Sequence, residues 1–158
     1  MIVKVRFLCE SYEEMSVAEK RASAFFQKFF IDIFEKHSEE EIARVGISNV
    51  ARNFSAGKCV VFKGNNKMAS ASYSANVKVY ASQVDAVKGI ISLAAKVEKE
   101  MVSKFKNVKK TGTSKRGDFA IKEFSFIRGK QAYTASMRFT FKPSDYAAFF
   151  IDIFQLRD

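Results

Sequence analysis

Two stretches of this chain alternate strictly between apolar and polar residues, and this period of two constrains the fold more than any other feature. The apolar members are Tyr73, Ala75, Val77 and Val79 in the first stretch and Tyr133, Ala135, Met137, Phe139 and Phe141 in the second. Successive side chains of a strand point to opposite faces, so each stretch predicts a strand with one buried face. Each follows another apolar segment across a Gly-containing turn, so we expect two hairpins, over 59–81 and 119–142.

Two long helices are predicted by an apolar spacing of i, i+4 and by capping residues. The first helix has two candidate capping boxes, each a Ser followed three residues later by Glu: Ser11 with Glu14, and Ser16 with Glu19. It runs to about Lys36, and the second helix covers 82–105. We also expect a strand over 2–9, a short helix over 38–46 and a basic loop over 108–118.

The hexapeptide FFIDIF occurs twice, at 29–34 in the first long helix and at 149–154 near the end of the chain. Pro143 and Ser144 precede the second copy and suit a helix start, so we predict a short C-terminal helix there. On a helix, each copy would form an apolar arc wider than one contact with a sheet requires. The arc is therefore either buried on two sides within the monomer or part of a subunit interface. The candidate interface residues are Phe30, Phe34, Phe149, Phe150 and Phe154.

Together these elements predict a single α+β domain over residues 1–158. Its order is β-α-β-β-α-β-β-α, which is ferredoxin-like in the first six elements. We expect a mainly antiparallel sheet of about five strands, with two long helices on one face and the short C-terminal helix added.

The positive charge is concentrated in the middle of the chain. The formal net charge is +10, but residues 58–142 carry 18 basic and 5 acidic residues, whereas the segments before and after are slightly acidic. A one-sided positive field attracts polyanions such as nucleic acid, or an acidic protein surface. The alternative is a lysine-rich surface that keeps the protein soluble and has no specific partner.

No combination of residues predicts catalysis, a metal site or a cofactor. The single histidine, His37, is expected at a helix C-terminus, where a positive charge suits the helix dipole. The stretch TGTSKRG (111–117) lacks the spacing of a phosphate-binding loop and precedes a strand. Cys9 and Cys59 have no metal-ligand spacing, and either stay reduced in the core or form one disulfide.

The polar face of the predicted sheet is the best candidate for a binding surface. If the strands share one sheet, this face presents hydroxyls and cations, with basic turns at its rim. The candidate nucleic-acid-binding residues are Lys4, Arg6, Lys63, Lys67, Lys78, Tyr80, Lys109, Lys110, Lys115, Arg116, Arg128, Lys130, Arg138 and Lys142. Hydroxyls and cations bind phosphates without reading bases. Tyr80 is the one aromatic residue that we expect on this face, so we predict no aromatic platform for single strands.

Two functional hypotheses follow. The first is a non-enzymatic module that contacts nucleic-acid backbone, without sequence specificity, through the 58–142 region and within a larger assembly. The second is a self-assembling structural subunit of a virus- or phage-type particle, with Phe-rich helices and sheet edges as interfaces. We expect no membrane partner, because no apolar run is long enough to span a bilayer. The expected location is cytoplasmic, or the virion for a structural subunit.

Overall fold

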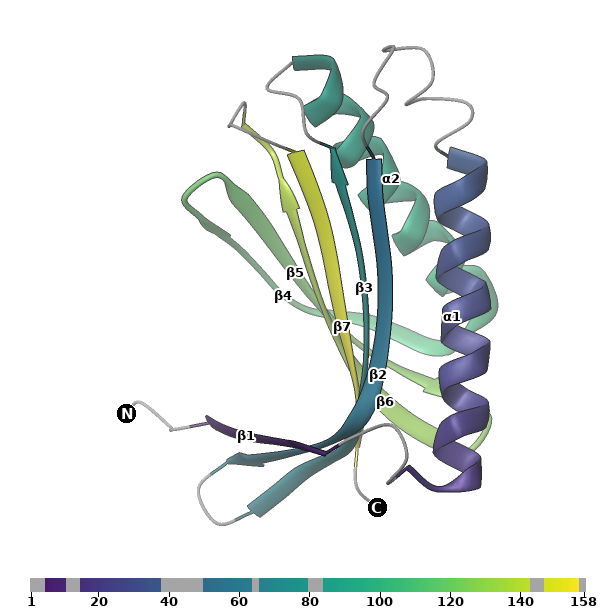
Figure 1. Ribbon diagram of the computed structural model, residues 1–158. Helices are drawn as coiled ribbons and strands as arrows, with labels where there is room; N and C mark the ends of the chain where they lie inside the picture. Colours follow the sequence, from purple (N-terminus) through teal and green to yellow (C-terminus); the bar gives the residue numbers. More distant parts are fainter. Residues whose placement is uncertain are drawn as a thin grey trace.

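The computed structural model describes residues 5–10, 15–37, 50–63, 66–79, 84–142 and 147–156. Two helices and seven strands follow one another in these ranges: β1 (Val5–Glu10), α1 (Val17–His37), β2 (Val50–Lys63), β3 (Asn66–Val79), α2 (Val84–Lys104), β4 (Lys106–Arg116), β5 (Phe119–Arg128), β6 (Gln131–Thr140) and β7 (Ala147–Leu156). The strands form one antiparallel sheet in the order β1-β2-β3-β7-β6-β5-β4. Both helices cover the same face of this sheet (Figure 1).

The predicted ferredoxin-like fold with five strands is wrong. A ferredoxin-like sheet is built from split strand–helix–strand units, whereas here β1 pairs directly and antiparallel with β2. The sheet has seven strands because two segments expected in other states are strands. The short helix expected over 38–46 lies outside the described residues.

The predicted C-terminal helix is instead β7, which lies between β3 and β6 near the middle of the sheet. Phe149, Ile151 and Ile153 alternate inward and are fully buried, while Phe150 and Asp152 point to the other face. In the first FFIDIF copy the buried residues follow helical spacing, and Ile31 and Asp32 are exposed. The same six residues thus satisfy a period of 3.6 on α1 and a period of two on β7.

The basic loop expected over 108–118 is also mostly a strand, β4, at one edge of the sheet. Apart from Val108, which packs against the core, its side chains are polar or absent on both faces, so the sequence shows no alternation that would mark a strand. The pairing of β4 with β5 shifts register between Lys110 and Gly112. Cations along an edge strand are typical of edges that avoid pairing with other chains.

The core lies between the sheet and the helices, and aromatic rings fill much of it. α1 packs over β2 and β3, while α2 packs over β4, β6 and β7. The ring of Phe26 lies 5.0 Å from that of Tyr73 and 5.3 Å from that of Tyr133, measured between centroids.

Helix α1 begins at the second of the two predicted capping boxes. The backbone amide of Ser16 donates a 2.8 Å hydrogen bond to the Glu19 carboxylate. The backbone amide of Glu19 donates a 3.1 Å hydrogen bond to the Ser16 hydroxyl.

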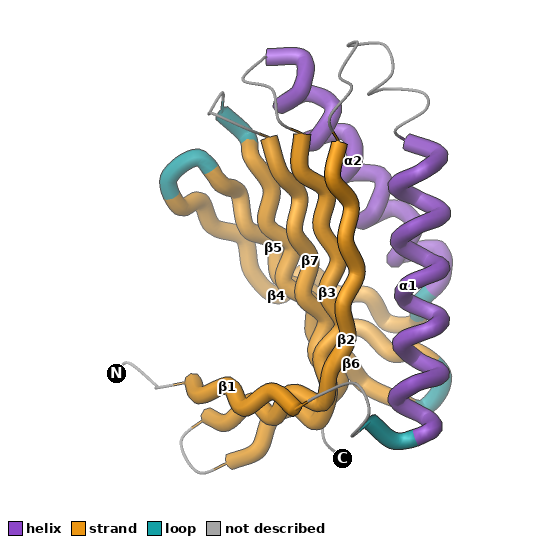
Figure 2. The backbone as a smooth tube through the Cα atoms, in the orientation of Figure 1, coloured by secondary structure: helices purple, strands orange, loops and turns teal. Residues whose placement is uncertain are grey.

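The opposite face of the sheet carries no helix within the described residues. In Figure 2 the outer parts of the sheet bend toward this uncovered side, which we call the open face. Strand β1 and the turn that joins β4 to β5 both project on this side, away from α1 and α2.

Candidate nucleic-acid interface

Strand register determines which side chains share the open face. On β7, Phe150 lies opposite Asn76 of β3 and Arg138 of β6, and Arg138 in turn lies opposite Ile121 of β5. The next row toward the β4–β5 turn pairs Thr140 with Phe119. Directly opposed residues project to the same face, so these residues form adjoining cross-strand rows.

Two phenylalanines and two cations meet in these rows, and we call Lys78, Phe119, Arg138 and Phe150 the open-face cluster. The Arg138 guanidinium lies 4.7 Å from the ring centroid of Phe150 and 5.4 Å from that of Phe119. The Lys78 ammonium lies 5.7 Å from the ring of Phe150, and the two rings are 6.3 Å apart. Arg138 is exposed, and the two rings are partly exposed. The three distances between a cation and a ring fit cation–π interactions.

One further cation lies beside the open-face cluster, and two more lie at the same end of the sheet. Arg116 is exposed and lies opposite Phe119 in the register of β4 and β5, so it shares the open face. Lys115 lies opposite Ala120 and therefore projects to the helix side. The Lys115 and Lys142 ammonium groups lie 5.0 and 5.3 Å from the ring of Phe141. Gly117, with φ of 61°, makes the turn between β4 and β5 that brings Arg116 back beside Phe119.

Two carboxylates lie in the row next to that of Arg138, on the side away from the β4–β5 turn, and mark the edge of the cationic region. Asp152 accepts a hydrogen bond of 2.6 Å from the Ser74 hydroxyl. Glu123 lies opposite Ser136 and Gly112, and the missing side chain of Gly112 leaves room for its Oε2. Phosphates approaching the open face would meet cations near the turn and repulsion beyond this row.

Other candidate residues lie away from the cluster. Lys110 faces the helices, and it and Lys122 hold the Glu98 carboxylate of α2 at 3.2 and 3.1 Å. The Arg128 guanidinium also faces the helices, 4.2 Å from the ring of Phe25. Lys109 is exposed opposite Ser125 on β5, and Lys130 is exposed in the β5–β6 turn at the other end of the sheet. Lys4, Tyr80 and the side chains of Arg6, Lys63 and Lys67 lie outside the described residues.

The candidate interface residues divide between the two faces of the sheet. Phe30, Phe34 and Phe149 are buried in the monomer's core, at 0–2% exposure. Packing within the chain therefore accounts for their apolar character. Phe150 and Phe154 are partly exposed on the open face.

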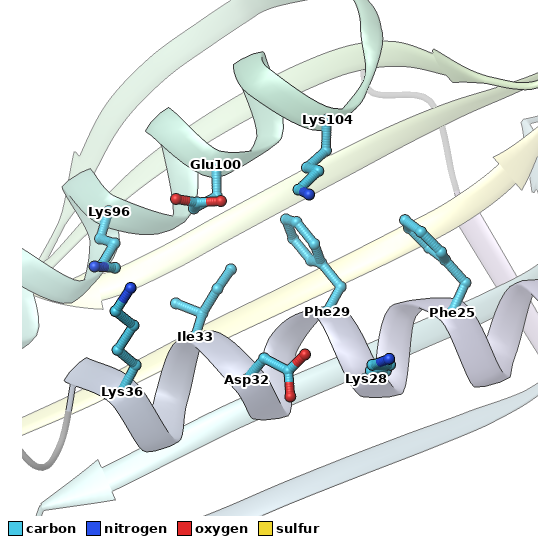
Figure 3. A pocket seen from close by; sticks show the side chains of 9 residues that line it. All are labelled: Phe25, Lys28, Phe29, Asp32, Ile33, Lys36, Lys96, Glu100 and Lys104. Atoms are coloured by element: carbon cyan, nitrogen blue, oxygen red, sulfur yellow. The ribbon is translucent and has the colours of Figure 1, made fainter.

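A second surface lies between the two helices, where a groove of about 430 Å³ runs along α1 and α2 (Figure 3). Phe25, Phe29 and Ile33 form its apolar floor. The Lys36 and Lys96 side chains point toward one another at one end, and Glu100 reaches in from α2. None of the candidate binding residues lines this groove, and it carries charges of both signs.

Metal-ligand side chains do not cluster in the described part of the chain. No group of three His, Cys, Asp or Glu side chains there can hold a metal ion. His37 is buried, and its Nε2 donates a 3.0 Å hydrogen bond to the carbonyl oxygen of Gly89, which ties α1 to α2. Neither of the two described helices has the length and apolar character to cross a membrane.

Sequence reasoning missed the aromatic part of the open face. Assigning 149–154 to a helix removed Phe150 and Phe154 from the sheet, and Phe119 was not assigned to either face. One signal was present: Phe149, Ile151 and Ile153 alternate with Phe150, Asp152 and Phe154. This alternation has a polar member only at Asp152, so it resembles a continuous apolar run, which fits a helix or a buried strand equally well.

No known protein family, curated protein or solved structure matches this chain. Its function is therefore inferred from the geometry of the open face.

Proposed function

We propose that this protein is a non-enzymatic module that binds nucleic-acid backbone without sequence specificity, within a larger assembly. The binding surface is the open face next to the β4–β5 turn. Lys78, Arg116 and Arg138 reach this surface from β3, β4 and β6.

One observation carries this proposal: the cations of this surface converge without a carboxylate partner among the described residues. The ion pairs of Lys58 with Glu19, and of Lys110 and Lys122 with Glu98, lie on the helix side. Lys78, Arg116 and Arg138 make no ion pair with a described residue, so their charge is available to a polyanion. Neutralising phosphates with such cations releases counterions, which makes affinity fall steeply with salt.

The test is fluorescence anisotropy with labelled DNA and RNA oligonucleotides of unrelated sequence, at about 50 and 200 mM salt. The test variant combines Lys78→Glu, Arg116→Glu and Arg138→Glu. The matched control combines Lys28→Glu, Lys88→Glu and Lys99→Glu, three exposed lysines on the helices, and changes the net charge equally. We expect the test variant to lose binding and the control to keep most of it. Equal loss in both variants, or no binding by the wild type at low salt, would overturn the proposal.

The alternative, a self-assembling structural subunit, draws less support from the described residues. Three of the five candidate interface phenylalanines already pack in the core. The β4 edge carries Lys106, Lys109, Lys110, Lys115 and Arg116, which would repel the same edge of a second copy. Light scattering at high protein concentration tests this alternative, because a strict monomer would argue against it.

A further inference from the structure

We infer that the open face prefers single-stranded nucleic acid and that Phe119, Arg138 and Phe150 form a platform for unpaired bases. This inference rests on the proposed function and adds the class of nucleic acid. It depends on β7 being a strand, because only that conformation places Phe150 between Asn76 and Arg138 on the open face.

The platform brings two aromatic rings and one guanidinium together on the open face. The rings of Phe119 and Phe150 lie 6.3 Å apart and are tilted by 53°, with the Arg138 guanidinium over both. Neighbouring strands are about 4.8 Å apart, so the row from Asn76 on β3 to Ser114 on β4 spans about 19 Å. A row of this length offers one continuous surface to several nucleotides.

The chemistry of the row favours unpaired bases over a duplex. In a duplex the base faces are stacked on one another, so an aromatic ring on a sheet cannot reach them. An unpaired base can stack on phenylalanine or on the plane of a guanidinium, and every base has such a face. Lys78 and Arg116 flank the rings, at positions suited to phosphates. The platform thus combines stacking with charge and needs no sequence-specific hydrogen bonds.

The carboxylates of Asp152 and Glu123 limit where a bound nucleic-acid strand can lie on the open face. Asp152 and Glu123 occupy the next row, so phosphates are favoured only on the side toward the β4–β5 turn. Replacing both with Asn and Gln should therefore strengthen binding of all polyanions without changing the preference for single strands.

The experiment compares three labelled probes at one salt concentration: oligo(dT), a duplex of equal length, and heparin as a polyanion without bases. The test variant is Phe119→Leu with Phe150→Leu, which keeps the apolar surface and removes the rings. Phe54→Leu is the matched control, because Phe54 is a partly buried phenylalanine on the helix side of β2. Circular dichroism and thermal melting check that each variant is folded.

We expect the wild type to bind oligo(dT) more tightly than the duplex. The double variant should lose about tenfold or more of its oligo(dT) affinity, the range that stacking of one or two bases supplies. Its affinity for the duplex and for heparin should change less than about twofold. The Phe54→Leu variant should bind all three probes like the wild type.

The failures of the two proposals are distinguishable. Equal wild-type affinity for oligo(dT) and duplex, with no effect of the double variant, would overturn the stacking platform and leave backbone binding intact. A parallel loss for all three probes would also overturn it, because the rings would then serve only to hold Arg138. Absence of binding to every probe at low salt would overturn the proposed function itself.

Discussion

The ring of Phe34 packs edge-on against the ring of Phe149, with centroids 5.9 Å apart and planes at 74°. Phe34 ends the first FFIDIF segment and Phe149 begins the second, so the helical copy contacts the strand copy in the core. Both side chains are at most 2% exposed. This contact joins α1 to the central strand of the sheet across 115 positions of the sequence.

Truncating either ring should strongly destabilise the fold. Phe34→Ala or Phe149→Ala should lower the free energy of unfolding by about 3–5 kcal/mol, because each leaves a cavity in a packed core. Phe150→Ala, next in sequence but on the open face, should cost about 1 kcal/mol or less. Urea unfolding measures all three. A similar cost at 149 and 150 would mean that β7 does not alternate as described.

Acid should weaken the link between α2 and the β4–β5 hairpin. Partial burial raises the pKa of Glu98, but hydrogen bonds from Lys122 and Lys110 outweigh it, and the net pKa lies below its ordinary value. Such a carboxylate contributes stability that is present above its unfolded pKa of about 4.3 and is lost as pH falls through the lower folded pKa.

Glu98→Gln should therefore cost up to about 1 kcal/mol near neutral pH, and this difference should shrink in acid. Lys122→Met, which removes one partner, should reproduce part of the loss. Unfolding free energies measured at several pH values check the trend. A difference that grew toward low pH would contradict the assigned ion pairs.

Alkali should destabilise the chain through Tyr73. Burial, aided by Tyr133 and Glu19, raises the pKa of Tyr73 far above its ordinary value. The folded state then favours the neutral phenol, so this stability is fully present below the unfolded pKa of about 10 and is lost as pH rises toward the folded pKa.

Tyr73→Phe removes the ionisable group and the 2.8 Å hydrogen bond that its hydroxyl donates to Gln155. We expect a cost of about 1 kcal/mol at neutral pH and a shallower loss of stability above pH 10. Wild type and variant share all lysines, so the difference between their alkaline unfolding curves isolates Tyr73. Parallel curves would refute the prediction.

Charge reversal in the groove between the helices should be stabilising. Lys36 and Lys96 point toward one another, so Lys36→Glu should create an attraction between α1 and α2. The expected gain is at most about 1 kcal/mol, because the pair is exposed to solvent. Adding Lys96→Glu should abolish it. A gain that persisted in the double variant would come from a different cause.

The sequence predicted the elements whose signals are local. α1 begins at the Ser16–Glu19 capping box, and α2 begins and ends within two residues of its expected bounds. The alternating stretches became β3 and β6, because one face of each is buried and the other is polar. β4 was not predicted, because an edge strand with Val108 as its single apolar residue shows no period.

The candidate site was predicted in part. Lys78 and Arg138 were assigned to the open face by alternation alone, and the structure places both there. Their aromatic partners were not predicted, because no local signal in the sequence indicates that β7 inserts between β3 and β6. Arg128 and Lys110 resembled the other cations in the sequence, but the register of β4 and β5 places both on the helix side, where they contact Phe25 and Glu98.

The sequence by itself determined the helical caps, the alternating strands and the concentration of positive charge in the middle of the chain. Only the tertiary structure decided the conformation of the second FFIDIF segment. The hexapeptide is apolar enough to bury as a helix or as a strand, so local propensity does not choose between them. The position between β3 and β6 favours the strand, because a strand there pairs its backbone on both sides and buries every second side chain against α1 and α2.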